Sequence, residues 1–218
     1  MQSVELLAEA YRPLVAFAEQ VDEAQGWTPT RLPGWTVRDL LWHLTSDGQR
    51  ALVALATPSE AEPDTDAVSY WTEWQPGTEG AQSGLRGTRI MASAWSSVRG
   101  PARLYAETAR AVLVAAGRAD PAAVITTQGR VLTVDSLLRT LAVEAAIHHL
   151  DLEPALPDPP VAVVLDEVRR TLDALLGSPA PPEWDAVRYA RIGTGRAEPD
   201  DAERTALGDR AGRLPLFG

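Results

Sequence analysis

The sequence predicts an all-α protein, an antiparallel helical bundle with an extra C-terminal helix and a short irregular tail. Apolar residues recur at helical spacing over several long stretches, and few segments show the alternating pattern of strands. The connections between these stretches are rich in Pro and Gly. With 218 residues, 45% hydrophobic and 23% charged, the chain is long enough for one domain with a substantial core.

The first half of the chain contains three expected helices. The first covers residues 3–25, and the loop "GWTPTRLPGW" follows it. Thr36 is expected to cap a second helix that ends near Leu55, because Asp39 completes a pattern like a capping box. Residues 56–83 are loop-like. A third helical stretch covers residues 85–116, with a kink or split expected at "RGP", residues 99–101.

The second half begins with an extended connection, "DPAAVITTQGRVLTV", that turns at Gly129. A fourth helix is expected over residues 134–152, a fifth over 161–176 and a short one over 200–207. We therefore expect residues 1–176 to form the bundle, and residues 177–218 to form a short C-terminal extension packed on it.

Charge and composition exclude several classes of protein. The net charge of −10 and a pI near 4.8 argue against binding to nucleic acid or to an anionic membrane. No apolar run approaches the roughly 20 residues that span a bilayer. The N-terminal segment "MQSVELLAEAYRPL" lacks a basic start and an apolar signal core, so we expect a cytoplasmic protein.

The chain contains no Cys, which excludes disulfides, thiolate zinc sites and a thiol nucleophile of its own. Any thiol chemistry would need a small-molecule thiol. All 20 basic residues are Arg, and Lys and Asn are absent. Because Lys and Asn have AT-rich codons, this usage indicates a GC-rich genome, such as that of an actinobacterium.

The segment "AVEAAIHHLDL", residues 142–152, places polar groups where a buried helix would carry Leu or Val. Helical geometry puts Glu144 and His148 one turn apart in the middle of the apolar stripe. An isolated carboxylate there would cost several kcal/mol unless it is paired, protonated or bound to a metal. His149 points about 100° away from His148, so we expect that it is not a ligand.

His43 lies at the edge of the apolar face of the second helix, from which it can reach a space between helices. A Glu-x3-His pair on one helix and a His on another make a plausible three-ligand metal site with open positions. Other roles stay open. His43 could be a hydrogen-bonded interfacial histidine, Glu144 and His148 could be a buried acid–imidazole pair, and "HH" could offset the helix dipole.

Three segments of the chain resemble the mycothiol-dependent maleylpyruvate isomerase family of the DinB-like superfamily: "LPGWTVRDLLWHLTS", "TTQGRVLTVDSLLRTLAVEAAIHHLDLEPAL" and "IGTGRAEPDDAERTALGDRAGRLPLFG". The resemblance implies a DinB-like four-helix bundle that holds a divalent metal, most often zinc (Zn2+), on His43, Glu144 and His148. It also implies that Asp151 supports the site, and that Arg86 in "LRGTRI" is an arginine on the substrate side.

The resemblance further implies a metal-dependent enzyme that uses mycothiol as a co-substrate, either to transfer the thiol to an electrophilic small molecule or to isomerise that molecule. A metallohydrolase that activates water remains an alternative, as does a non-catalytic bundle that binds a small molecule or a partner helix. For the thiol-dependent enzyme, the expected partners are a small-molecule thiol and an electrophile, and the protein is expected to be a monomer or a homodimer.

We expect Trp71, Trp74 and Arg86 near the pocket mouth, where aromatic faces and a guanidinium could hold the substrate. Packing of the long loop is the alternative for the tryptophans. We expect Asp151 to orient a metal-binding histidine. The alternatives are a cap on a local backbone group or a pair with an Arg such as Arg139 or Arg169.

Overall fold

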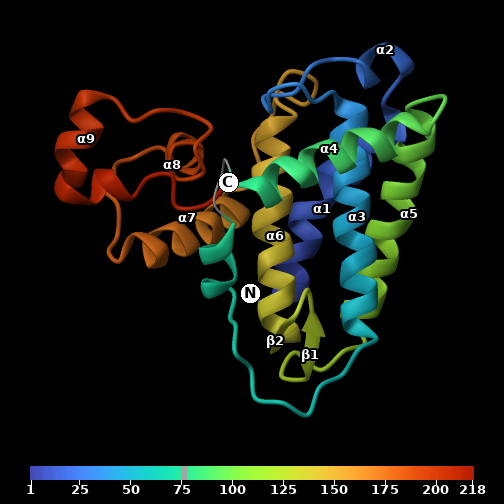
Figure 1. Cartoon of the computed structure of the whole chain (residues 1–218), viewed down its shortest axis with the longest axis horizontal. Coiled ribbons are helices and arrows are strands. Elements are labelled where there is room, and N and C mark those ends of the chain that lie inside the picture. The colour runs from blue at the N-terminus through green and yellow to red at the C-terminus, as the bar shows by residue number, and fades with distance from the viewer. Residues whose placement is uncertain (75–77) are drawn as a thin grey trace.

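The computed structural model describes residues 1–74 and 78–218, and its centre is a bundle of four long helices (Figure 1). These are α1 (Ser3–Gln20), α3 (Val37–Leu55), α5 (Arg99–Ala116) and α6 (Val134–Asp151). Helices α1 and α6 run in one direction, and α3 and α5 run in the other (Figure 1). The chain therefore has to return along the whole bundle between α3 and α5. This return explains the length of the connection that contains η1 (Ser69–Glu73) and α4 (Glu79–Ser93).

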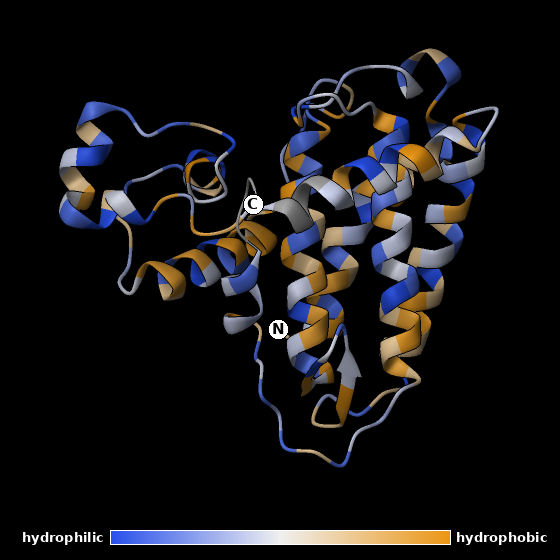
Figure 2. Ribbon diagram, in the orientation of Figure 1, coloured by the Kyte–Doolittle hydropathy of each residue, from blue (hydrophilic) through white to orange (hydrophobic). Residues whose placement is uncertain are grey.

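Local sequence signals fix the ends of the two helices that carry the site. The Thr36 backbone N–H donates to Asp39 Oδ2 at 2.8 Å, which completes the expected capping box at the start of α3. At the start of α6, the Thr133 hydroxyl accepts from the Ser136 N–H at 3.1 Å. Polar and apolar residues alternate along the bundle helices (Figure 2), and the apolar ones form a buried core that includes Leu7, Leu14, Leu40, Leu41, Val112 and Leu138.

Three expected boundaries were wrong. Helix α4 begins at Glu79, within the stretch of residues 56–83 that was expected to be loop-like and before the expected helix start at residue 85. The helix expected over residues 3–25 is broken after α1, because the Asp22 side chain accepts from the Gln25 N–H at 2.8 Å and starts the short helix α2 (Glu23–Gly26). The split expected at residues 99–101 lies earlier, between α4 and α5. Pro101 instead occupies the first turn of α5, where a missing backbone N–H breaks no helical hydrogen bond.

A β-hairpin lies between α5 and α6, as the extended pattern predicted. Strand β1 (Val124–Thr127) pairs antiparallel with β2 (Arg130–Thr133). The two-residue turn has positive φ at both positions, 51° at Gln128 and 77° at Gly129, as a type I′ turn requires. The hairpin also attaches to the end of α3, since the Thr126 N–H donates to the Thr57 carbonyl at 3.1 Å.

After α6 the chain forms α7 (Ala162–Leu176), α8 (Ala186–Gly193), α9 (Asp201–Leu207) and η2 (Gly208–Arg213), which extend to one side of the bundle (Figure 1). The sequence pattern predicted α7 and α9 but not α8. Helix α7 contacts both α6 and α8, so the domain boundary expected after residue 176 stays a prediction. Among the described residues, no helix is long and apolar enough to cross a membrane.

Candidate metal centre

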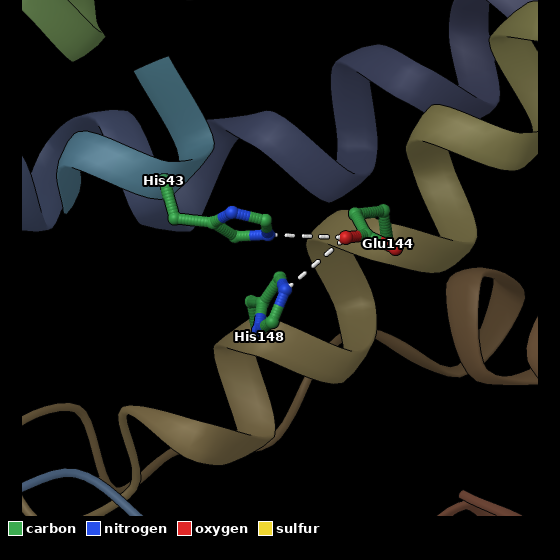
Figure 3. Close-up of side chains that lie close together, drawn as sticks. All are labelled: His43, Glu144 and His148. Carbon is green, nitrogen blue, oxygen red and sulfur yellow. Dashed lines mark hydrogen bonds and ion pairs between the residues drawn. The ribbon is translucent and has the colours of Figure 1, made fainter. Parts of the chain in front are cut away.

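Three polar side chains from two bundle helices point toward one another (Figure 3). His43 extends from α3, and Glu144 and His148 extend from successive turns of α6. Glu144 Oε1 lies 3.2 Å from His43 Nε2 and 3.2 Å from His148 Nε2. One ligand atom from each residue lies within 4.8 Å of the others. The structure thus brings together the three residues that the sequence predicted as metal ligands, two in the apolar stripe of one helix and one at the edge of the apolar face of another.

The geometry of this group fits a divalent metal. Bonds of about 2.0–2.2 Å to a tetrahedral zinc separate its ligand atoms by about 3.3 Å, close to the two distances found here. Two imidazole nitrogens and one carboxylate oxygen form a donor set that zinc accepts, and they leave coordination positions for another molecule. The side chains of His43 and Glu144 are 21% and 27% exposed, so the group can be reached from solvent.

The segment before α3 fixes the direction of His43. The Trp35 ring is buried and meets the His43 ring edge to face, with 5.4 Å between the ring centroids. Thr36 then starts the helix, which sets the angular position of His43 seven residues later. This packing gives a physical reason for the Trp and Thr in the segment "LPGWTVRDLLWHLTS".

Asp151 connects His148 to the C-terminal segment. Its Oδ2 lies 2.9 Å from His148 Nδ1, so that nitrogen carries a hydrogen and donates it. Arg196 donates to both Asp151 oxygens, at 2.9 Å each, and the Asp151 side chain is fully buried. The arginine is therefore neither of the two considered from the sequence. Arg139 pairs with Asp135 and Glu167, and Arg169 donates to backbone carbonyls.

Proton affinities in the group follow from burial and from these contacts. Burial lowers the pKa of His43, and its contact with Glu144 only partly offsets this. Burial also acts to lower the pKa of His148, but the contacts with Asp151 and Glu144 outweigh burial and raise it to about 9. Burial acts to raise the pKa of Glu144, but the two imidazoles hold it well below its usual value. Without metal, His148 is therefore an imidazolium at neutral pH.

Asp47 is a neighbour of the group that the sequence reasoning missed. Its Oδ2 lies 3.2 Å from His43 Nε2, its other oxygen pairs with Arg50, and the residue is only 5% exposed. Asp47 follows His43 by one helical turn, so helical spacing could have identified it. Arg196 could not have been identified this way, because it lies far along the chain in a segment without a strong periodic pattern.

His149 lies away from the group, as its helical position predicted. Its Nε2 donates to the Asp158 carbonyl at 2.8 Å, in the loop after α6. Burial lowers the pKa of His149, which favours the neutral ring.

The three residues expected at the pocket mouth differ in their surroundings. Trp71 is buried and stacks on Phe217 at 4.4 Å between ring centroids, whereas Trp74 is 38% exposed. Arg86 lies on the exposed side of α4. The stacking of Trp71 agrees with the packing alternative, and a substrate role for Trp74 or Arg86 stays a prediction.

The fold and the site define a helical-bundle protein with a candidate centre for a divalent metal. The chain belongs to the mycothiol maleylpyruvate isomerase N-terminal domain family, whose sequence profile matches residues 7–153. That range contains α3, α5, α6, most of α1 and the three metal-ligand candidates. The family is named after an enzyme, so this chain is a member of an enzyme family.

Two solved structures share the fold. The mycothiol-dependent maleylpyruvate isomerase superposes with a TM-score of 0.59 at 18% identity, covering 89% of this chain and 88% of that one. A variant of that isomerase with one histidine replaced by alanine gives a TM-score of 0.62 at 17% identity, with the same coverage. At these identities the likeness establishes the fold. No curated protein sequence matches the chain.

Proposed function

We propose that the protein is a metal-dependent enzyme that uses mycothiol to act on an electrophilic small molecule, by thiol transfer or by thiol-assisted isomerisation. The observation that carries the proposal is the group of His43, Glu144 and His148, with its 3.2 Å separations and its access from solvent. The family name and the absence of Cys support a thiol supplied from outside the chain.

In this proposal His43, Glu144 and His148 hold a divalent cation, and zinc is the metal that best suits the donor set. When bound, the cation favours the thiolate form of a coordinated thiol at neutral pH. Asp151 accepts the Nδ1–H of His148 and so keeps Nε2 directed at the metal position. Glu144 supplies the negative charge that offsets part of the charge of the cation.

The thiolate then has two chemically reasonable reactions. It can add to an activated carbon–carbon double bond, which allows rotation about the resulting single bond, and then leave so that the isomerised double bond forms again. It can instead displace a leaving group, in which case the sulfur stays on the product. The same centre with water in place of thiol would be a hydrolase.

A comparison of substrates separates these possibilities. Zinc-loaded protein is incubated with activated cis-alkenes, alkyl halides or esters, with and without mycothiol, and products are followed by mass spectrometry and NMR. We expect conversion of an alkene or a halide only when mycothiol is present. Ester hydrolysis without thiol would instead identify a hydrolase. No conversion, together with no binding of mycothiol by the zinc-loaded protein, would favour a non-catalytic bundle.

The proposal also gives Arg86 a role in holding a carboxylate of the electrophile, and Trp74 an apolar contact with it. Arg86→Ala should raise KM for a carboxylate-bearing electrophile while KM for mycothiol stays the same. Unchanged kinetic constants would remove Arg86 from the substrate site.

A further inference from the structure

A hollow of about 590 Å³ lies between the C-terminal half of α3 and the turn of the β-hairpin. The hairpin is held against the end of α3 by the hydrogen bond from Thr126 to Thr57 and by pairing of Pro58 with Ile125. Both walls are therefore parts of regular structure. A volume of this size is in the range of small-molecule sites.

The walls of the hollow carry polar groups that can bind a neutral ligand. On the donor side, the Gln49 amide and the Thr127 hydroxyl have no hydrogen-bond partner in the described part of the chain, and neither does the Gln128 amide nitrogen. On the acceptor side, the hydroxyls of Ser46 and Thr57 donate to the carbonyls of Trp42 and Val53, which leaves their lone pairs available.

The charge of the hollow favours a neutral ligand over an anion. Arg50 is the charged residue among its lining residues, and its guanidinium already pairs with Asp47. The Thr side chains and Val53 add methyl groups between the polar ones. A surface that offers methyl groups, donors and acceptors together suits a sugar or cyclitol, whose C–H groups alternate with hydroxyls that both donate and accept.

One chain of contacts connects the hollow with the candidate metal centre. Arg50, in the wall, pairs with Asp47, whose other oxygen lies 3.2 Å from His43 Nε2. On the opposite wall, the Tyr70 hydroxyl donates to Gln128 Oε1 at 2.8 Å. Burial, together with the charge of Glu144, raises the pKa of Tyr70 to about 12.

We propose that this hollow binds the polyhydroxylated part of the thiol co-substrate while the thiol itself reaches the metal centre. Ser46, Arg50 and Val53 follow His43 on α3 by about 5, 10 and 15 Å along the helix axis, which a cysteinyl arm joined to a sugar can span. Mycothiol has this form, a cysteine joined to a glucosaminyl-inositol. The inference thus rests on the proposed function and assigns the residues that select this thiol over simpler ones.

Binding of two thiols to zinc-loaded protein tests the inference without relying on turnover. Calorimetry compares mycothiol with N-acetylcysteine, which carries the same thiol group but no sugar. The double variant Gln49→Leu/Thr127→Val removes two polar groups of the hollow and leaves its shape nearly unchanged. We expect mycothiol to bind about tenfold more weakly to this variant, since each lost hydrogen bond has a modest net effect, while N-acetylcysteine binds as before. The control variant Gln20→Leu/Thr205→Val makes the same changes at exposed positions of α1 and α9, outside the hollow, and should alter neither affinity.

The outcomes that overturn the inference differ from those that overturn the proposed function. If the double variant binds mycothiol as tightly as wild type does, the sugar is held elsewhere, and the thiol-dependent function stands. If both thiols weaken equally, the substitutions act on the metal centre or on the fold, and the hollow is not a sugar site. If wild type binds neither thiol, the proposed function fails and the inference fails with it.

Discussion

His148 is held at both ring nitrogens, with Glu144 at Nε2 and Asp151 at Nδ1. Without a third neighbour, the contact between Glu144 and His148 would simply be a buried acid–imidazole pair. The placement of His43 on the other side of the same Glu144 oxygen makes a metal centre the more complete explanation.

The first prediction concerns the stoichiometry of the metal. Wild type should bind about one zinc per chain, and His148→Ala should bind almost none, because two ligands hold zinc much more weakly than three. Elemental analysis of folded, dialysed protein measures this. His149→Ala, which removes the adjacent imidazole, should keep its metal. A His148→Ala protein with full metal content would show that His148 is not a ligand.

Metal affinity should also depend on pH. The pKa of His148 is raised to about 9 without metal, so at pH 7 zinc must displace a proton from its Nε2. His43 has a lowered pKa and is already neutral there. Apparent affinity should therefore rise about tenfold per pH unit from pH 7 to pH 9 and level off above that. Competition with a chelator at each pH measures it, and a constant affinity over this range would contradict the role of His148.

Asp151→Asn should weaken zinc binding by about 10- to 100-fold while the fold is kept, because the amide is a poorer acceptor for the His148 N–H. Asp135→Asn provides a control, since Asp135 lies on the same helix and pairs with Arg139 away from the site. Zinc affinity within a factor of about two of wild type would limit Asp151 to a structural role.

At the scale of the elements, close packing of α3 on α5 keeps His43 in position. Gly48 lies at this contact, where an added Cβ would be 2.7 Å from Thr108 Cγ2. Gly48→Ala should therefore lower the free energy of unfolding by about 1–3 kcal/mol through overpacking. Gly84→Ala in α4 meets no atom within 4 Å and should raise it by about 0.5–1 kcal/mol. Urea unfolding compares the two, and equal effects would contradict the packing argument.

The sequence predicted the elements that carry strong local signals. The capping residues Thr36 and Thr133 located the starts of α3 and α6, and Gly177, with φ of 85°, ends α7 where the apolar pattern stops. It did not predict α8, a short helix in a segment rich in Pro and Gly. The break after α1 was missed because Asp22 acts as a cap within an otherwise continuous apolar pattern.

For the candidate site, helical periodicity predicted that Glu144 and His148 share a face and that His149 does not. Periodicity describes one helix at a time, so it could not give the distance between His43 and Glu144, which depends on how α3 and α6 pack. It also could not predict the contact between Asp151 and Arg196, which joins residues 45 positions apart through the path of the C-terminal segment.

At the scale of the whole molecule, ion pairs and an aromatic stack attach the C-terminal segment to the rest of the chain. Arg196 pairs with Asp151, Glu153 pairs with both Arg31 and Arg191, and Phe217 stacks on Trp71. Among the ion pairs named here, that of Arg196 with Asp151 is the most buried, with side-chain exposures of 10% and 0%.

Arg196→Gln should therefore lower the stability of the metal-free protein by about 3 kcal/mol, because it leaves the Asp151 carboxylate buried with one partner fewer. Arg204→Gln removes an ion pair of the same segment whose partner, Glu198, is almost fully exposed, and its effect should be below about 0.5 kcal/mol. Thermal unfolding of the two variants without metal checks this. Similar losses in both would show that burial of the Asp151 pair contributes little.

Because Asp151 contacts both His148 and Arg196, zinc binding and the docking of the C-terminal segment are coupled. Any free energy by which the docked C-terminal segment improves zinc binding must equal the free energy by which zinc improves docking, since the two form a closed thermodynamic cycle. Loss of zinc would then weaken the docking of Arg196 on Asp151 by that same free energy.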